Sequence, residues 1–247
     1  MDRMLYLAMS GAKQTLQAQA VNSNNLANAT TTGFKADLEQ FRSMPVYGQG
    51  MPSRVYAMTE RPGTDFTPGT FNTTGRDLDV AVRGEGWMTV QSADGSEAYT
   101  RSGNLMVNAN GILTNGSGHP VIGNNGRTIV IPPAETIEIG TDGTVSIRPV
   151  GQAPNVLAEV DRIKLVNPEF DQMTKGTDGL MRLKDGSNVE ADISVQLVSG
   201  ALEGSNVNTI DAMVKMIELQ RQYEMQVKMM KTAKEDDASA TSIMRLA

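Results

Sequence analysis

The chain has 247 residues, of which 39% are hydrophobic and 4% are aromatic, and its formal net charge is −6. This length allows one large domain or two small ones, with a core built mainly from Val, Ile, Leu, Met and Ala. Lysine and arginine form no stripe, which argues against nucleic-acid binding and against attraction to an acidic membrane surface. No run of about 18 apolar residues occurs, so we expect no membrane-spanning helix.

The sequence gives weak information on compartment. It contains no cysteine, which is compatible with the cytosol and equally with an oxidising compartment. The first twenty residues do not form a secretory signal, because Asp2 is their first charge and Lys13 interrupts a short apolar run. If the protein leaves the cytoplasm, we expect export without a cleaved signal peptide.

The N-terminal region, residues 1–34, is predicted to form a helix. Its apolar residues recur at steps of three, four or seven, at Leu5, Met9, Ala12, Leu16, Ala20 and Ala27. A narrow stripe rich in alanine lets another helix approach closely, as in a seam between packed helices. An ordinary amphipathic helix on its own domain's core explains the stripe equally well.

That helix runs into the motif VNSNNLANATTTGFK, residues 21–35. Asparagine is unfavourable inside helices because its side chain competes for backbone hydrogen bonds. We interpret the motif as the end of the helix and the turn out of it. Asn25 and Asn28 would meet polar partners on a neighbouring helix or exposed backbone, Gly33 would allow a tight bend, and Phe34 would anchor the following segment.

Residues 35–69 contain several prolines and glycines, which block helix propagation and favour extended chain. We predict an extended connector with one or two strands.

Residues 70–204 change to a period of two, as in DLDVAVRGEGWMTVQ, and contain repeated Asp-Gly and Asn-Gly pairs. Alternation with short turns indicates an antiparallel all-β sandwich or barrel-like domain. The Asp-Gly pairs lack the acidic spacing of an EF-hand, so we interpret them as turns and not as calcium loops.

The C-terminal region, residues 205–247, is again helical, with Asn208 or Thr209 as the N-cap and Asp211 in the first turn. One apolar stripe comprises Met213, Met216, Tyr223, Val227 and Met230. A second comprises Val214, Ile217, Met225 and Met229. Two stripes predict neighbours on more than one side, although a helix buried in the core of a single domain is the alternative.

A helix at each end of a β-domain is natural if the two helices pair with each other, antiparallel and outside that domain. Such a pair buries too little surface by itself to offset about 1–2 kcal/mol of ordering entropy per backbone residue. We therefore expect the termini to be poorly ordered in the free subunit and to fold on assembly. Contacts that repeat head-to-tail without closing generate a filament or tube.

Four segments in the same order resemble the bacterial flagellar rod and hook protein family: NNLANATTTGFK, DLDVAVRGEGWMTV, YTRSGNLMVNANGIL and GALEGSNVNTIDAMVKMIELQRQYEMQ. Within that family the short connector resembles the proximal-rod members, and the distal-rod or hook subunits are the alternative. Trp87 stands where relatives often have Phe.

The resemblance implies a structural, non-enzymatic subunit of the basal-body rod, a periplasmic tube that transmits torque from motor to hook. It implies export through the flagellar type III apparatus and contacts with other rod subunits and with copies of itself. The terminal helices would form an inner axial coiled coil, and the β-domain an outer layer.

Residues for enzymatic chemistry are sparse. His119 is the sole histidine and lies in a turn-like stretch, so neither a zinc site nor a Ser-His-Asp triad can be assembled with it. One Trp argues against a carbohydrate-binding or hydrolase domain, and the absence of a long heptad repeat argues against an adhesin stalk. We predict no cofactor, no metal, no nucleic acid and no small-molecule substrate.

The expected fold is α+β, with the N- and C-terminal helices paired as an axial coiled coil and with a central, mostly antiparallel all-β domain. The candidate assembly interface comprises Leu5, Met9, Ala12, Leu16, Asn25, Asn28, Gly33, Phe34, Asn206, Met213, Met216, Ile217, Tyr223, Val227 and Met230.

Overall fold

A computed structural model describes residues 3–45, 55–149, 151 and 157–246. The chain divides into two compact units. Unit 1 comprises Met1–Asn28, Asp37–Asp65 and Val207–Ala247, and unit 2 comprises Ala29–Ala36 and Phe66–Asn206. The middle of the expected connector, around Gly48 and Pro52, lies outside the described residues.

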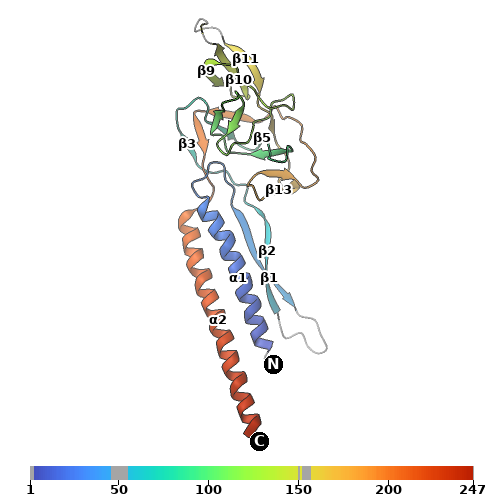
Figure 1. Ribbon diagram of the computed structural model, residues 1–247, viewed down its shortest axis with the longest axis vertical. Coiled ribbons are helices and arrows are strands. Elements are labelled where there is room, and N and C mark those ends of the chain that lie inside the picture. Colours follow the sequence, from blue (N-terminus) through green and yellow to red (C-terminus); the bar gives the residue numbers. More distant parts are fainter. Residues whose placement is uncertain (1–2, 46–54, 150, 152–156, 247) are drawn as a thin grey trace. The chain divides into compact units, whose positions relative to one another are not determined.

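The elements, labelled in Figure 1 where space allows, follow in chain order. They are α1 (Arg3–Ala27), β1 (Asp37–Pro45), β2 (Val55–Thr64), β3 (Phe71–Thr73), β4 (Val80–Arg83), β5 (Trp87–Gln91), β6 (Glu97–Thr100), β7 (Leu105–Val107), β8 (Leu113–Asn115), β9 (Ala134–Ile139), β10 (Thr144–Pro149), β11 (Ala158–Arg162), β12 (Leu165–Val166), the 3-10 turn η1 (Phe170–Gln172), β13 (Met173–Lys175), β14 (Met181–Leu183), β15 (Gln196–Ser199), β16 (Ala201–Glu203) and α2 (Thr209–Leu246).

In unit 1 the helices α1 and α2 pack side by side and antiparallel (Figure 1). The Asn22 side-chain amide donates to the Ala212 carbonyl oxygen at 2.7 Å. Farther along, a Cβ placed on Gly11 would lie 2.9 Å from the Gln226 side chain. The predicted pairing of the terminal helices is confirmed. Neither described helix is long and apolar enough to cross a membrane.

The buried side chains of α1 are small or medium-sized, whereas the buried and half-buried side chains of α2 include Met, Leu and Tyr. The buried positions on α1 are Ala8, Ala12, Thr15, Ala18 and Asn22. On α2 the buried and half-buried positions are Ala212, Met216, Leu219, Tyr223, Gln226, Met230 and Ala233. The α2 positions follow alternating steps of four and three residues, which is the spacing of a coiled-coil seam. The buried alanines of both helices let the helix backbones approach closely. They are Ala8, Ala12 and Ala18 on α1 and Ala212 and Ala233 on α2.

The start of α2 is fixed by Asn208, one of the two N-cap candidates. Its side-chain oxygen accepts hydrogen bonds from the Ile210 and Asp211 amides at 3.0 and 3.4 Å. Asp211 lies in the first turn, where the helix dipole favours a negative charge. The local sequence therefore determines where this helix begins.

The hairpin β1–β2 completes unit 1 and packs on α1 (Figure 1). Its strands pair from Asp37 with Thr64 to Pro45 with Val55, with an irregularity between Leu38 and Gln40. The stretch expected to be an extended connector thus contributes two long strands to the helical unit.

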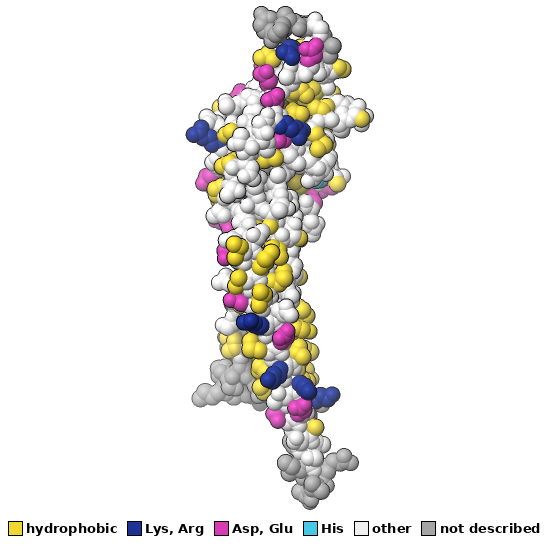
Figure 2. All heavy atoms as spheres, turned by 90° about the vertical axis from the view of Figure 1, so that its left-hand side faces the viewer, with side chains coloured by type: hydrophobic (Ala, Val, Ile, Leu, Met, Phe, Trp, Pro, Cys, Tyr) yellow, Lys and Arg dark blue, Asp and Glu magenta, His cyan; other side chains and the backbone are white. Residues whose placement is uncertain are grey.

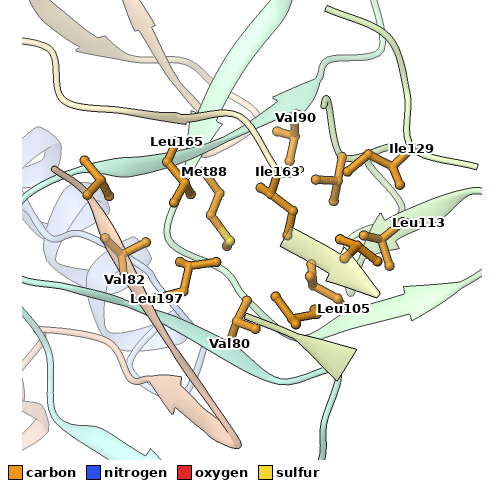
Figure 3. Close-up of a cluster of buried hydrophobic side chains, with 14 of the residues drawn as sticks. Val80, Val82, Met88, Val90, Leu105, Leu113, Ile129, Ile163, Leu165 and Leu197 are labelled. Carbon is orange, nitrogen blue, oxygen red and sulfur yellow. The ribbon is translucent and has the colours of Figure 1, made fainter. Parts of the chain in front are cut away.

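Unit 2 is built from antiparallel strand pairs, which confirms the predicted β-domain. Its sheets have the orders β11-β10-β9, β12-β5-β6-β14-β13, β15-β4, β16-β3 and β7-β8. Alternating apolar residues of these strands point into a common core, which Figure 3 shows around Val80, Met88, Leu105, Leu113 and Leu197. A second, smaller cluster surrounds Trp87 and Tyr99.

The Asp-Gly and Asn-Gly pairs form turns, as predicted. Six of them place glycine at a φ between 71° and 87°, at Gly95, Gly111, Gly126, Gly143, Gly179 and Gly186. The aspartates of these turns accept a hydrogen bond from the backbone amide two residues later, as Asp94 does from Ser96 and Asp142 does from Thr144. These bonds, together with those from the Ser96 and Thr144 hydroxyls, lower the pKa of both carboxyls.

The turn at Asp178 carries the largest of these shifts. Asp178 accepts hydrogen bonds from the Arg182 guanidinium at 2.9 and 2.6 Å and from the Leu180 amide at 3.1 Å. The bonds from Arg182, followed by the backbone bond, lower the pKa of Asp178 to about 2. The stabilising contribution of Asp178 is therefore complete above its unfolded-state pKa of 3.8 and is lost as the pH falls toward 2.

We expect Asp178→Asn to reduce the pH dependence of unit 2 stability between about pH 4 and about pH 2, because the variant lacks the titrating carboxyl. Arg182→Leu should reduce it by a second route, since it removes the partner that lowers the pKa. Urea midpoints read from Trp87, the sole tryptophan, measure the effect. Equal pH slopes in wild type and both variants would contradict this prediction.

Candidate assembly site

Large apolar side chains on α1 lie outside the buried positions of that helix. Leu5, Met9 and Leu16 are 40%, 54% and 47% exposed, whereas Ala12 is buried. The stripe predicted from the sequence therefore divides: Ala12 is covered by the chain's own elements, whereas the larger members face away and Ala20 and Ala27 are exposed. These larger side chains are available for contacts outside this chain.

Helix α2 shows the same division. Met216, Tyr223 and Met230 are half-buried in the heptad positions, while Met213, Ile217 and Val227 are exposed. The remaining large apolar residues of the second stripe are also exposed, together with Ile210: Val214, Met225 and Met229. Figure 2 shows hydrophobic side chains gathered along the helical part of the chain. An extended apolar surface of this kind marks an interaction site in a soluble protein.

The hairpin adds apolar surface that sequence reasoning missed. Leu38, Phe41, Met44 and Val55 are each about half exposed. The spacing of three between Leu38, Phe41 and Met44 was visible in the sequence, but the surrounding prolines and glycines suggested an extended connector with one or two strands and not an apolar surface. Exposed apolar side chains on a two-stranded sheet with open edges favour pairing with another chain.

The two asparagines singled out in the N-terminal motif have partners within unit 1. The Asn25 side chain donates to the Asp37 carbonyl and accepts from the Asp37 amide, both at 2.9 Å. The Asn28 side chain donates to the Asn24 carbonyl at 2.9 Å and so gives a hydrogen-bond donor to a carbonyl in the last turn of the helix. Asn25 thus joins the end of α1 to the start of β1.

The eight residues between these elements, Ala29–Ala36, belong to unit 2 and are called the N-terminal linker. Gly33 has a φ of +67°, and its amide donates to the Glu203 carbonyl at 2.8 Å. A Cβ there would lie 2.3 Å from the Arg101 carbonyl carbon, so only glycine fits. Phe34 is half-buried, with the Lys175 ammonium 3.8 Å above its ring.

A buried ionic cluster, formed by Lys35, Arg101 and Glu203, lies where the linker meets the β-domain. The Lys35 ammonium is 2.7 Å from Glu203 Oε1, and Arg101 Nη1 is 3.1 Å from Glu203 Oε2. The three side chains are 1%, 3% and 0% exposed. Removing one partner from a buried pair costs much more than breaking a surface pair, because the remaining charge is left uncompensated.

Backbone groups complete the ionic cluster. Arg101 donates to the Gly86 and Gly84 carbonyls at 3.0 and 2.7 Å, and its guanidinium lies 5.2 Å from the centre of the Trp87 ring. Lys35 also donates to the Thr67 carbonyl at 2.8 Å, and the Gly69 amide donates to Glu203 Oε1 at 2.9 Å. The cluster joins residues from five separate stretches of unit 2.

Asn206, the remaining predicted residue, supports the same junction. Its side-chain oxygen accepts from the Ala36 amide at 2.8 Å, and its own amide donates to the Phe34 carbonyl at 3.3 Å. Its side-chain nitrogen donates to the Thr67 carbonyl at 3.3 Å. The structure therefore brings Gly33, Phe34 and Asn206 together inside unit 2, whereas the predicted apolar residues belong to the helices of unit 1.

The sequence did not predict Lys35, Arg101 and Glu203 as a group, although each lies in one of the segments that resemble the rod and hook proteins. Lys35 ends TTTGFK, Arg101 lies in YTRSG, and Glu203 lies in LEGSNV. One charged residue in each of three separate motifs was a signal that the motifs meet.

No catalytic or metal-binding arrangement accompanies these features. Among the described residues, no group of three or more His, Cys, Asp or Glu side chains could hold a metal ion. The His119 amide donates to the Asn115 side chain at 2.9 Å, as in a structural turn.

Comparisons with known proteins point in one direction. Residues 5–35 match the family model described as flagella basal body rod protein, residues 81–147 match flagellar hook protein FlgE/F/G D1 domain, and residues 198–243 match flagellar basal body rod FlgEFG protein C-terminal. Flagellar basal-body rod protein FlgF of Salmonella typhimurium is 43% identical, and that of Escherichia coli 42%, each over the full length of both chains. Flagellar basal-body rod protein FlgG of Bacillus subtilis is 32% identical over 95% of this chain and 96% of its own.

Replacing Glu203 tests the importance of the ionic cluster. We expect Glu203→Ala to lower the free energy of unfolding of unit 2 by about 3–5 kcal/mol, because two buried cations lose their carboxylate. Urea unfolding followed by Trp87 emission measures the loss. The matched control is Glu135→Ala, which removes a partly exposed carboxylate from its pair with Arg148 and should cost about 1 kcal/mol or less. Similar costs for both variants would contradict the assignment.

Proposed function

Because this chain belongs to the family of flagellar basal-body rod proteins, which are structural proteins and not enzymes, we propose that it is a proximal-rod subunit that assembles through unit 1. In this role many copies and relatives stack into the tubular shaft that transmits torque from motor to hook. The helices α1 and α2 contribute to the inner layer of the tube, and the β-domain to an outer layer.

The observation that carries this proposal is the position of the large apolar side chains on unit 1. The buried positions on α1 hold small or polar side chains, while Leu16, Ile217 and Val227 face outward. Each buried large side chain contributes about 1.5–3 kcal/mol when it leaves water. The isolated unit forgoes this contribution at many positions, whereas a packed neighbour recovers it.

The partners that fit this surface are other rod subunits, including second copies of this chain. Methionine is frequent on the exposed face of α2, at Met213, Met225 and Met229. Its flexible thioether side chain adapts to irregular gaps, which suits a face that must meet more than one neighbour. We place the assembled protein in the periplasmic part of the basal body, reached through the flagellar type III export apparatus without a cleaved signal peptide.

Charged substitutions on the outward-facing stripes test the assembly surface. We expect Leu16→Asp and Val227→Asp to abolish flagellar assembly and motility, because each places a charge in an apolar interface between subunits. Purified variants should keep native Trp87 emission, since both residues belong to unit 1. Gln17→Asp, at an exposed polar neighbour on α1, is the control and should swim normally. Normal motility of both apolar-site variants would refute the surface.

Limited proteolysis tests whether unit 1 depends on assembly for its order. We expect protease to trim both ends of the purified free subunit and to leave a core of roughly residues 70–200, because the helix pair alone does not offset its ordering entropy. In isolated basal bodies the same termini should resist cleavage. Termini as resistant as the core in the free subunit would count against assembly-coupled folding.

A further inference from the structure

The N-terminal linker, Ala29–Ala36, is an excursion between two elements of unit 1 that are tied to each other. Reciprocal hydrogen bonds of 2.9 Å between Asn25 and Asp37 close the base of this excursion. The tie lies outside the linker, so it does not require the linker to be docked on unit 2. Either state of the linker is compatible with the same join between α1 and β1.

The linker is held on unit 2 chiefly by polar and ionic contacts. Lys35 is its single buried residue, whereas the other seven are half-buried or exposed. Gly33 and Ala36 each give their amide to an acceptor of unit 2, at 2.8 Å in both cases, and Thr32 pairs with Ser102 at 3.1 Å. Amides and hydroxyls of this kind exchange protein partners for water at small net cost.

The rest of the ionic cluster remains complete without Lys35. Glu203 keeps its pair with Arg101 and the hydrogen bond from the Gly69 amide. Arg101 keeps the Gly84 and Gly86 carbonyls and the face of Trp87. One carboxylate and one guanidinium form a neutral pair, and docking of the linker adds a second buried cation. The desolvation cost of that cation offsets part of what its pair with Glu203 and its bond to the Thr67 carbonyl contribute to docking.

From these contacts we propose that the N-terminal linker is a releasable latch, that is, a segment that docks on unit 2 and detaches from it while unit 2 stays folded. Lys35 holds the linker in place by pairing with Glu203, and the Arg101–Glu203 pair is the preformed site that accepts Lys35. In the docked state Lys35 pairs with Glu203, and Gly33 lies against the backbone of Arg101 and Ser102. In the released state the linker is hydrated, Arg101 and Glu203 stay paired, and the strands of unit 2 stay folded. The protein therefore has two states that differ in the attachment of a segment and not in its fold.

Native-state hydrogen exchange of the full chain tests the latch directly. We expect the Gly33 and Ala36 amides to exchange through a local opening whose free energy hardly changes with low concentrations of urea. Amides of β4 and β5 should exchange only through global unfolding, and their protection should fall steeply with urea. A single urea dependence shared by the linker and both strands would overturn the proposal, because the linker would then be an inseparable part of the core.

A matched pair of glycine variants supplies the second arm. In Gly33→Ala the new Cβ would collide with the Arg101 backbone, so we expect linker protection to fall by about tenfold or more while the strands keep most of theirs. Gly126→Ala has a similar backbone conformation, φ +74°, with open space around the Cβ, and should leave the linker docked. Lys35→Ala should release the linker, because it removes the ammonium group that pairs with Glu203.

The outcome for the core decides between a latch and an integral segment. Native Trp87 emission and strand protection in Gly33→Ala support the latch. Loss of native Trp87 emission in Gly33→Ala but not in Gly126→Ala would overturn it, since the linker could then leave only with the unfolding of unit 2. Unchanged linker protection in both Gly33→Ala and Lys35→Ala would overturn it as well.

Discussion

The carboxylate of Glu203 is the constraint on which the junction of unit 2 depends. It lies fully buried between Lys35 and Arg101, and it comes from the last strand of the β-domain. A buried carboxylate without cations would be prohibitively costly, and the cations without it would be costly in turn. Lys35 of the linker, Arg101 directly after β6 and Glu203 of β16 therefore meet at one point when the linker is docked. Stretches 168 residues apart in the chain are held together there.

Unit 1 follows a different principle, because its shape depends on small side chains. Alanine at Ala8, Ala12, Ala18 and Ala212 brings the helices close together, while a single buried amide bond from Asn22 to Ala212 sets their register. A buried polar residue at a seam fixes register at some cost in stability. The cost fits a unit whose larger apolar side chains point outward, where they contribute little to the stability of the isolated chain.

Local chemistry made much of the fold predictable from the sequence. The Asn208 cap, the Asp-Gly turns and the alternating strands around Val80 and Val82 each depend on residues close together in the chain. The helix stripes were predicted less completely, because a helix with two apolar sides does not reveal which side its own partner covers. On α1 the larger residues Leu5, Met9 and Leu16 dominated the pattern, whereas the buried positions Thr15 and Asn22 looked polar.

The ionic cluster was beyond sequence reasoning for a physical reason. Charged residues are usually solvated, so Lys35, Arg101 and Glu203 individually predict exposed positions. Only the folded structure shows that these three segments meet and that Glu203 pairs with both cations. The hairpin was equally hard to foresee, since pairing between residues such as Met44 and Tyr56 depends on long-range closure and not on the residues of either strand alone.

The unequal lengths of the two helices have a geometric consequence. Helix α2 has 38 residues and α1 has 25, and the antiparallel contact of Asn22 with Ala212 aligns the end of the shorter helix with the beginning of the longer one. The remaining 13 residues of α2 extend beyond the start of α1 by about 20 Å. One end of the bundle thus contains both helices and the other only α2, so the two ends of the bundle differ. A shaft made of such pieces in one orientation has an intrinsic direction that every piece specifies.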